Sequence, residues 1–419
     1  MEAGTRWNES VELRDSATGR FTRRLTVGGM LNNTPTYHHG SAFTADSRYL
    51  VLVTVRAGRS AIVRAEVATG ELTVLAGVEG FGRASSGEQH LWAPGPLGAG
   101  GFAPTNVALA PGSGWAVAAC AEKLLAVHVE TGELRTLYTY EAGWSGATPG
   151  ADRSGRRAYL PLVPKHPQFD PARPHQPLDS YSQLMLDRHG GIHSRVVEVE
   201  IDTGACRMVY EDDIAGCNHI LLSPVDDDLA LVDRDLPPTF SYYGDNCESP
   251  RAHLLRLSTG QLTPLRPRNR HQFQSHVNWN RDGTAIYYHG PAYEGHEQPV
   301  RPGGRLGEMF VGVSDLEGRS VFEMNLPAYQ YGHVSTHTQA DAIVSDGLFT
   351  PDCICAMHYR ELDSRGQPRI ELLGRHGTDW SGLPGQLSHP HCHVSPDGRW
   401  LSYNRVAGGR SDVYVIAIA

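Results

Sequence analysis

The chain has 419 residues with 46 Gly and 27 Pro, a composition that predicts many turns and few long helices. Its net charge of −9 argues against nucleic acid as the main partner, because phosphate binding usually requires a basic face. The seven cysteines form no zinc-type pairs, so we expect reduced thiols. No stretch approaches the roughly 18 apolar residues of a membrane span, and no signal region begins the chain, which predicts a cytoplasmic protein without membrane contact.

One pattern recurs along the chain: a turn with Asp, Gly or Ser, followed by an alternating apolar strand. In chain order the turns lie around Asp46, Gly112, Ser154, Asp227, Asp282, Asp341 and Asp397. Most copies continue into a strand, a Thr-Gly turn and another strand, as in residues 64–75. Gly permits the positive φ of such a tight hairpin. Each unit therefore predicts one four-stranded blade.

The two ends of the chain predict a closed ring. The seventh unit ends at residues 412–419 without its Thr-Gly hairpin, and residues 15–26 near the start supply a matching piece. A first segment that completes the last blade would remove the open sheet edge. We therefore expect an all-β, seven-bladed β-propeller that spans residues 1–419 as a single domain, with the last blade closed by the N-terminal strand.

Histidines recur at one phase of the repeat, just before the turns. His389 and His391 flank Pro390, and an extended strand would place both side chains on one face. Comparable positions in the earlier units hold His38, His39, His219, His276, His333 and His337. Because equivalent positions of the blades converge at one end of the channel, these imidazoles are expected to meet and bind a metal. The alternative for each is an ordinary hydrogen-bonded histidine.

These features resemble the oligogalacturonate lyases of polysaccharide lyase family 22. The resemblance rests on five features, which are Gln386-x-x-His389-Pro390-His391, Ser275-His276 with Trp279, the hairpin at 199–204, the Arg195 before it, and Asn218-His219-Ile220. It implies a propeller that uses a divalent metal, manganese, to cleave short oligogalacturonides by β-elimination. The implied partner is a small anionic oligosaccharide.

The resemblance also implies roles for individual residues. The metal ligands would be His276, Gln386, His389 and His391, with His219 as the Brønsted base and Arg195 as its catalytic partner. Three imidazoles and one amide oxygen would also suit zinc, nickel or iron. Val277 replaces the aromatic or acidic residue that commonly follows the first ligand in this family, which leaves the preferred uronide open.

The chemistry of elimination explains why these residue types are needed. A cation on the uronate carboxylate stabilises the charge that develops when the C5 proton leaves, and a neutral imidazole can accept that proton near neutral pH. Further contacts to the sugar are expected from His39, His333, His337 and Arg270. Two alternatives remain, namely a lyase for another uronic-acid oligosaccharide and a non-catalytic propeller that binds sugars or proteins.

Overall fold

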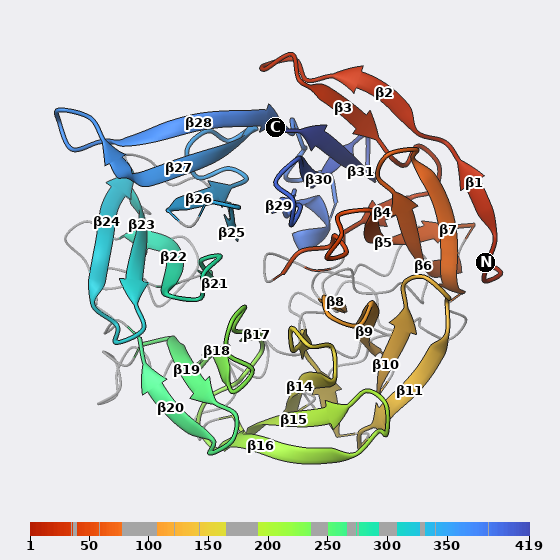
Figure 1. Ribbon diagram of the computed structural model, residues 1–419, viewed down its shortest axis with the longest axis vertical. Coiled ribbons are helices and arrows are strands. Elements are labelled where there is room, and N and C mark those ends of the chain that lie inside the picture. The colour runs from red at the N-terminus through yellow and green to blue at the C-terminus, as the bar shows by residue number, and fades with distance from the viewer. Residues whose placement is uncertain are drawn as a thin grey trace.

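The computed structural model describes residues 1–34, 36, 40–57, 59–77, 107–120, 122–141, 143–164, 192–235, 250–265, 274, 276–292, 308–326, 332–339, 341–383 and 385–419. In this part of the chain, β-sheets stand radially in a ring around a central axis (Figure 1). No helix among these residues is long and apolar enough to cross a membrane. Because the regular elements of the described residues are strands apart from one short 3-10 turn, the all-β prediction is confirmed.

Five sheets are separate antiparallel meanders. The first and second contain β8 (Val107–Ala110), β9 (Trp115–Cys120), β10 (Lys123–His128) and β11 (Leu134–Thr139), and then β12 (Trp144–Gly146), β13 (Gly150–Ala151), β14 (Arg157–Pro164), β15 (Ser194–Glu200) and β16 (Cys206–Asp212). The third and fourth contain β17 (Ile220–Leu222), β18 (Leu229–Asp233), β19 (Ala252–Arg256) and β20 (Gln261–Pro264), and then β21 (Val277–Trp279), β22 (Ala285–Ala292), β23 (Glu308–Asp315) and β24 (Ser320–Leu326). The fifth contains β25 (Val334–Thr336), β26 (Ala342–Ser345), β27 (Cys353–Leu362) and β28 (Pro368–Arg375). The first strands β8, β17, β21 and β25 lie nearest the axis (Figure 1).

The remaining sheet has ten strands and combines the two ends of the chain. One part holds β4 (Leu31–Asn33), β5 (Tyr49–Arg56), β6 (Arg59–Glu66), β7 (Glu71–Gly77) and β1 (Arg6–Asn8), and the other holds β29 (His393–Val394), β30 (Trp400–Ala407), β31 (Arg410–Ala417), β3 (Phe21–Arg24) and β2 (Val11–Arg14). A parallel contact between Ser411 and Leu31 joins the two parts.

The central strands are apolar along their whole length because neighbouring sheets cover both of their faces. In β5, every residue from Tyr49 to Val55 is buried. The outer hairpins turn at Thr-Gly pairs as predicted, and Gly70 and Gly204 both have positive φ there, at 76° and 71°. The core is therefore made between sheets, and the inner strands are free to display side chains at the axis.

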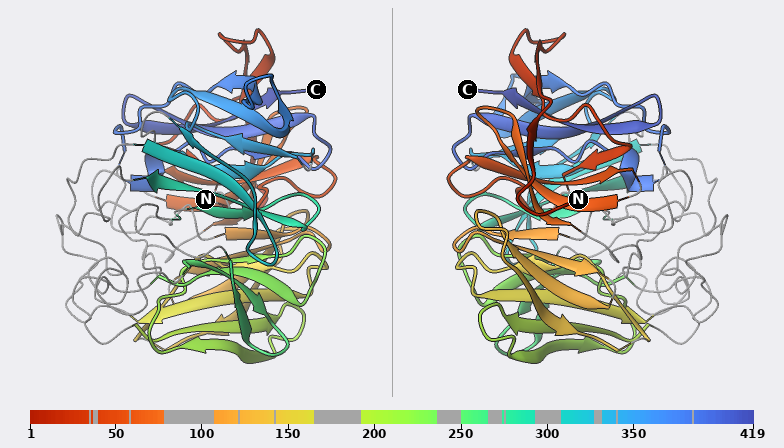
Figure 2. Two further views of the ribbon diagram at one scale, coloured as in Figure 1. Left: turned by 90° about the vertical axis from the view of Figure 1, so that its left-hand side faces the viewer. Right: turned by 90° about the vertical axis from the view of Figure 1, so that its right-hand side faces the viewer.

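The N-terminal segment closes the ring. β3 pairs with the last strand, with Thr22 opposite Ile416 and Arg24 opposite Tyr414, which confirms the predicted pairing of the two ends. Arg24 also forms an ion pair with Asp412. β1 pairs with β7, so that the N-terminal segment joins both parts of the ten-stranded sheet along the outer side of the ring (Figure 2).

Deleting residues 1–26 should destabilise the whole ring, because it uncovers the edges of β31 and β7 together. We expect the Tm to fall by about 10 °C or more, with aggregation on heating. A synthetic peptide of residues 11–26, added in trans, should restore part of this loss by pairing with β31. An unchanged Tm in the deletion variant would show that the segment does not close the fold.

Candidate functional site

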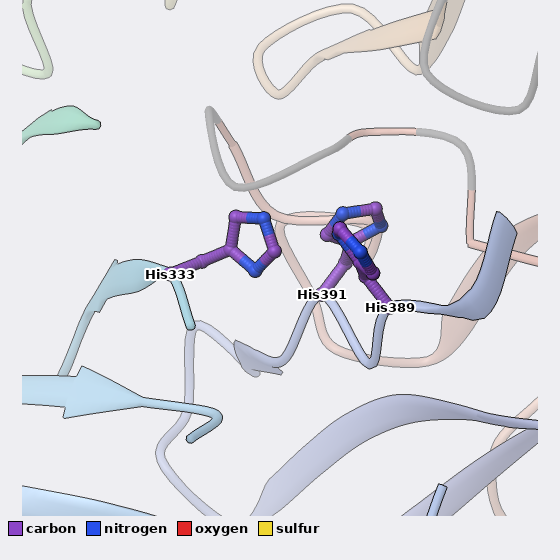
Figure 3. Close-up of side chains that lie close together, drawn as sticks. All are labelled: His333, His389 and His391. Atoms are coloured by element: carbon purple, nitrogen blue, oxygen red, sulfur yellow. The ribbon is translucent and has the colours of Figure 1, made fainter. Parts of the chain in front are cut away.

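Three buried imidazoles converge at one mouth of the channel, where β25 and β29 begin. The ring of His333 points toward those of His389 and His391 (Figure 3). The ligand nitrogens of the three all lie within 4.8 Å of one another. The ring centroid of His333 is 5.3 Å from that of His389 and 4.6 Å from that of His391. This spacing allows one metal ion to contact all three imidazoles.

A turn, and not an extended strand, aims two of these rings. The chain passes from η2 (Gly385–Ser388), a single 3-10 turn, into His389-Pro390-His391, and β29 begins only at His393. His391 has a φ of 44°, in the left-handed region that costs energy for a residue with a side chain. The backbone N–H of Asn404 donates to the carbonyl of Pro390 at 2.7 Å. The rings of His389 and His391 thus converge by a different backbone path from the predicted one.

The third imidazole is held from behind by a carboxylate. Asp346 accepts the backbone N–H of His333 at 2.6 Å, and its two oxygens lie 3.1 and 3.2 Å from Nδ1 of the same residue. Burial would raise the pKa of Asp346, but the charge and hydrogen bonds of His333 outweigh it and set that pKa to about 2. An ionised carboxylate only accepts hydrogen bonds, so Nδ1 of His333 carries the proton and Nε2 is the nitrogen for a metal.

His276 lies beside this group but outside it. Its ring centroid is 4.6 Å from that of His333, and its Nδ1 lies 2.7 Å from Nε2 of His289. Burial, and then the neighbouring His333 and His289, lower the pKa of His276 well below its usual range, so the ring is neutral. The structure therefore groups His333 with His389 and His391, whereas the sequence motifs indicated His276 as the third imidazole.

A second buried network surrounds the predicted base. His219 Nδ1 donates to Asp233 at 2.8 Å, and Arg251 contacts both Asp233 at 2.8 Å and Asp235 at 2.6 Å. Burial raises the pKa of Asp233, but Arg251 and His219 together lower it below its usual value. His219 and Arg251 both act electrostatically on His276, which places this network next to the imidazole cluster.

Arg195, the predicted partner of His219, contacts other side chains. It stands on β15, where its Nε donates to Glu211 at 3.0 Å and its guanidinium covers the ring of Trp144 at 4.5 Å. Its side chain is 34% exposed. Among the described residues, Arg251 is the arginine that contacts Asp233, the carboxylate paired with His219. Sequence motifs did not reveal Arg251. No motif marks Arg251, Asp233 or Asp346, because only strand pairing brings them to the histidines.

The other predicted residues lie away from this cluster or outside the described part of the chain. His337 lines a cavity of about 340 Å³ that follows the axis away from the imidazoles, at the far ends of the inner strands. Burial lowers its pKa, and its ring lies 6.2 Å from that of His358. The side chain of Gln386, and the whole of His39 and Arg270, lie outside the described residues. Their roles stay predictions.

The amino-acid sequence matches no protein-family model and no curated protein. The structure, however, is similar over its whole length to an oligogalacturonate lyase in complex with manganese, with 17% identity, a TM-score of 0.75, and coverage of 100% of this chain and 99% of that one. It is similar to the same extent to an oligogalacturonate lyase from Vibrio parahaemolyticus, with 19% identity and a TM-score of 0.72, again covering 100% and 99%.

The chain has the fold of the oligogalacturonate lyases. The resemblance drawn from the sequence motifs is thereby confirmed at the level of the fold. A hydrazine synthase from Kuenenia stuttgartiensis is also similar, with 13% identity, a TM-score of 0.55, and coverage of 94% and 99%. Since such different proteins share the architecture, the activity must be argued from the site.

Asp346→Asn tests how the third imidazole is held. The amide is neutral and no longer enforces the Nδ1–H form of His333, so Mn²⁺ affinity should fall about 10- to 100-fold. Titration calorimetry on the metal-free protein measures this loss. Asp352→Asn is the matched control, because that half-exposed carboxylate pairs with Arg375 and not with an imidazole. Equal affinities in the two variants would contradict the assigned role of Asp346.

Proposed function

We propose that the protein is a metal-dependent lyase that cleaves short oligogalacturonides by β-elimination and leaves a 4,5-unsaturated uronate. The observations that carry this proposal are the convergence of His333, His389 and His391 and the contact of His219 with Asp233. The oligogalacturonate lyase fold supports it. The partner is a small anionic oligosaccharide, and the proposed location is the cytoplasm, where imported fragments arrive.

We also propose that the chain is one domain with seven blades, in which the ten-stranded sheet comprises two. Seven separate segments line the axial cavity, which supports this count. They are represented by Thr36, Leu109, Thr148, Leu222, Asn280, Thr338 and Ser395. The strand pairing between β31 and β4 is limited to Ser411 and Leu31, which agrees with two blades that touch at their edge.

The proposed metal ligands are His333, His389 and His391, with Gln386 as the fourth. Neutral imidazoles suit several divalent ions, and manganese is proposed because one structural neighbour is a complex with it. When bound, the ion would neutralise the uronate carboxylate and so acidify the C5 proton. The burial of the three imidazoles keeps competing water away from this contact.

His219 is the proposed base. Asp233 accepts its Nδ1–H and so leaves Nε2 as the basic nitrogen, in the manner of a carboxylate–histidine pair. The C5 proton moves to Nε2, the C4–C5 double bond forms, and the C4–O bond breaks as the glycosidic oxygen takes a proton from water. Arg251, held between Asp233 and Asp235, places a positive charge beside His219 and takes the role expected of Arg195.

The experiment that tests this function is incubation with a panel of uronic-acid oligomers, followed by ultraviolet absorbance of the new double bond. Di- and trigalacturonate should react fastest, and chelation followed by dialysis should abolish turnover until Mn²⁺ is restored. Faster reaction of a glucuronate-containing oligomer would indicate a lyase of other specificity. If no oligomer reacts in the presence of Mn²⁺, the result would indicate a non-catalytic binding protein.

His219→Ala should lower kcat about 10²- to 10⁴-fold, the usual cost of losing a general base. Mn²⁺ affinity should stay unchanged, because His219 is not among the three grouped imidazoles. His128→Ala is the control, since His128 ends β10 at the outer part of another sheet. Activity of His219→Ala within a few-fold of the wild type would show that another group removes the proton.

A further inference from the structure

Most outer edges of the sheets carry a feature that hinders pairing with another chain. The outermost strands β11, β16, β24 and β28 each contain one residue more than the strand that they pair with, and these extra residues are Leu137, Val209, Val321 and Leu373. A bulge of this kind twists an edge strand away from a partner. β20 ends on Pro264, which has no N–H to donate. These five edges are therefore poor templates for a further strand.

The edge strand β2 has neither a bulge nor a proline. It pairs with β3 in an unbroken register, from Val11 opposite Arg24 to Arg14 opposite Phe21. All four of its residues are exposed, and it lies at the outside of the ring with no other described element beyond it (Figure 1). The other regular edge, β1, is only three residues long and packs Trp7 against the core. A regular, exposed edge strand is a template for pairing with another chain, so β2 is the edge that calls for a partner.

The alternation of the ladder determines which main-chain groups of β2 face outward. The N–H of Asp15 donates to the carbonyl of Arg20 at 2.9 Å, so the polar main-chain groups of Asp15 point toward β3. Successive residues of a strand direct these groups to opposite sides. Those of Leu13 therefore also point toward β3, whereas those of Glu12 and Arg14 point outward. The free edge offers the N–H and C=O groups of these two residues.

The outward-facing residues suit pairing with a second copy of the same strand. A two-fold axis at Leu13 places Glu12 of each copy opposite Arg14 of the other, as hydrogen-bonded pairs of an antiparallel ladder. Each pair then combines a carboxylate with a guanidinium, and the two Leu13 side chains meet at the centre. An axis at Glu12 or at Arg14 would place two like charges opposite each other, which is unfavourable.

We propose that two copies of this chain associate by antiparallel pairing of β2 with β2 around a two-fold axis at Leu13. The pairing satisfies the outward N–H and C=O groups of Glu12 and Arg14 in both copies. Val11 and Leu13, which are 42% and 41% exposed, share one face of the strand, and the association covers part of this apolar surface. The contact uses the outer side of the ring and none of the residues of the proposed catalytic site.

The first test is the mass of the protein in solution, measured by sedimentation velocity at about 10 to 300 µM because the interface is small. The wild type should approach twice the mass of one chain as the concentration rises. Glu12→Arg and Arg14→Glu should each remain monomeric, since each places like charges opposite each other. An equal mixture of the two variants should dimerise again, because each variant supplies the charges that the other lacks. A wild type that is monomeric at every concentration, or a mixture that stays monomeric, would overturn the proposal.

The second test locates the two-fold axis by cross-linking. Leu13→Cys places two thiols at the centre, where the Cα atoms of a non-hydrogen-bonded pair lie about 4.5 Å apart and a disulfide can form. Val11→Cys is the matched control, because Val11 is equally exposed on the same strand face but lies away from the axis. Mild oxidation should link most Leu13→Cys chains into dimers. Val11→Cys should stay at the level of the wild type, in which the exposed Cys206 sets the background. Equal linkage of the two variants would overturn the proposal.

Discussion

Everything at the mouth of the channel depends on the pairing of each inner strand with the strand behind it. The inner strands are only two to four residues long where the structure describes them, and their outer neighbours are bound into packed sheets. The short strand thus has a fixed register, and a one-residue slip would turn its side chains to the opposite face. The register sets which buried group faces each histidine, and so sets its tautomer.

The electrostatic balance of the site follows from burial. Taking Asp233 and Asp346 out of water would favour their neutral forms, yet hydrogen bonds and nearby cations keep both pKa values low. The reverse holds for His276 and His289, whose pKa values are lowered by the same burial. The ionised Asp233 and Asp346 therefore lie close to the neutral His276 and His289, an arrangement in which a divalent cation would supply positive charge.

Much of this architecture could be predicted from local sequence rules. The turn residues and alternating apolar runs predicted the meanders, and the unmatched hairpin near Asp15 predicted the pairing of β3 with β31. The phase of the histidines relative to the turns predicted that His389 and His391 would meet. The meanders and the pairing of β3 with β31 could be predicted because turn residues and strand periods are local signals, whereas His389 and His391 meet through a left-handed turn and not on one strand face.

The parts that could not be predicted depend on contacts across the sheets. Asp346 and Arg251 carry no motif, and they become partners of histidines only through strand pairing. Arg195 follows a motif but stands on the third strand of its sheet, where Glu211 and Trp144 hold it. His391 reaches the other imidazoles through a left-handed backbone, which no strand pattern anticipates.

We expect one divalent ion to bind where His333 meets the turn that holds His389 and His391. The most direct measurement is an anomalous difference map from a crystal soaked in Mn²⁺. A single strong peak within bonding distance of one nitrogen from each of His333, His389 and His391 is the predicted result. A peak bound by His276 in place of His333, or no peak among these imidazoles, would contradict the account.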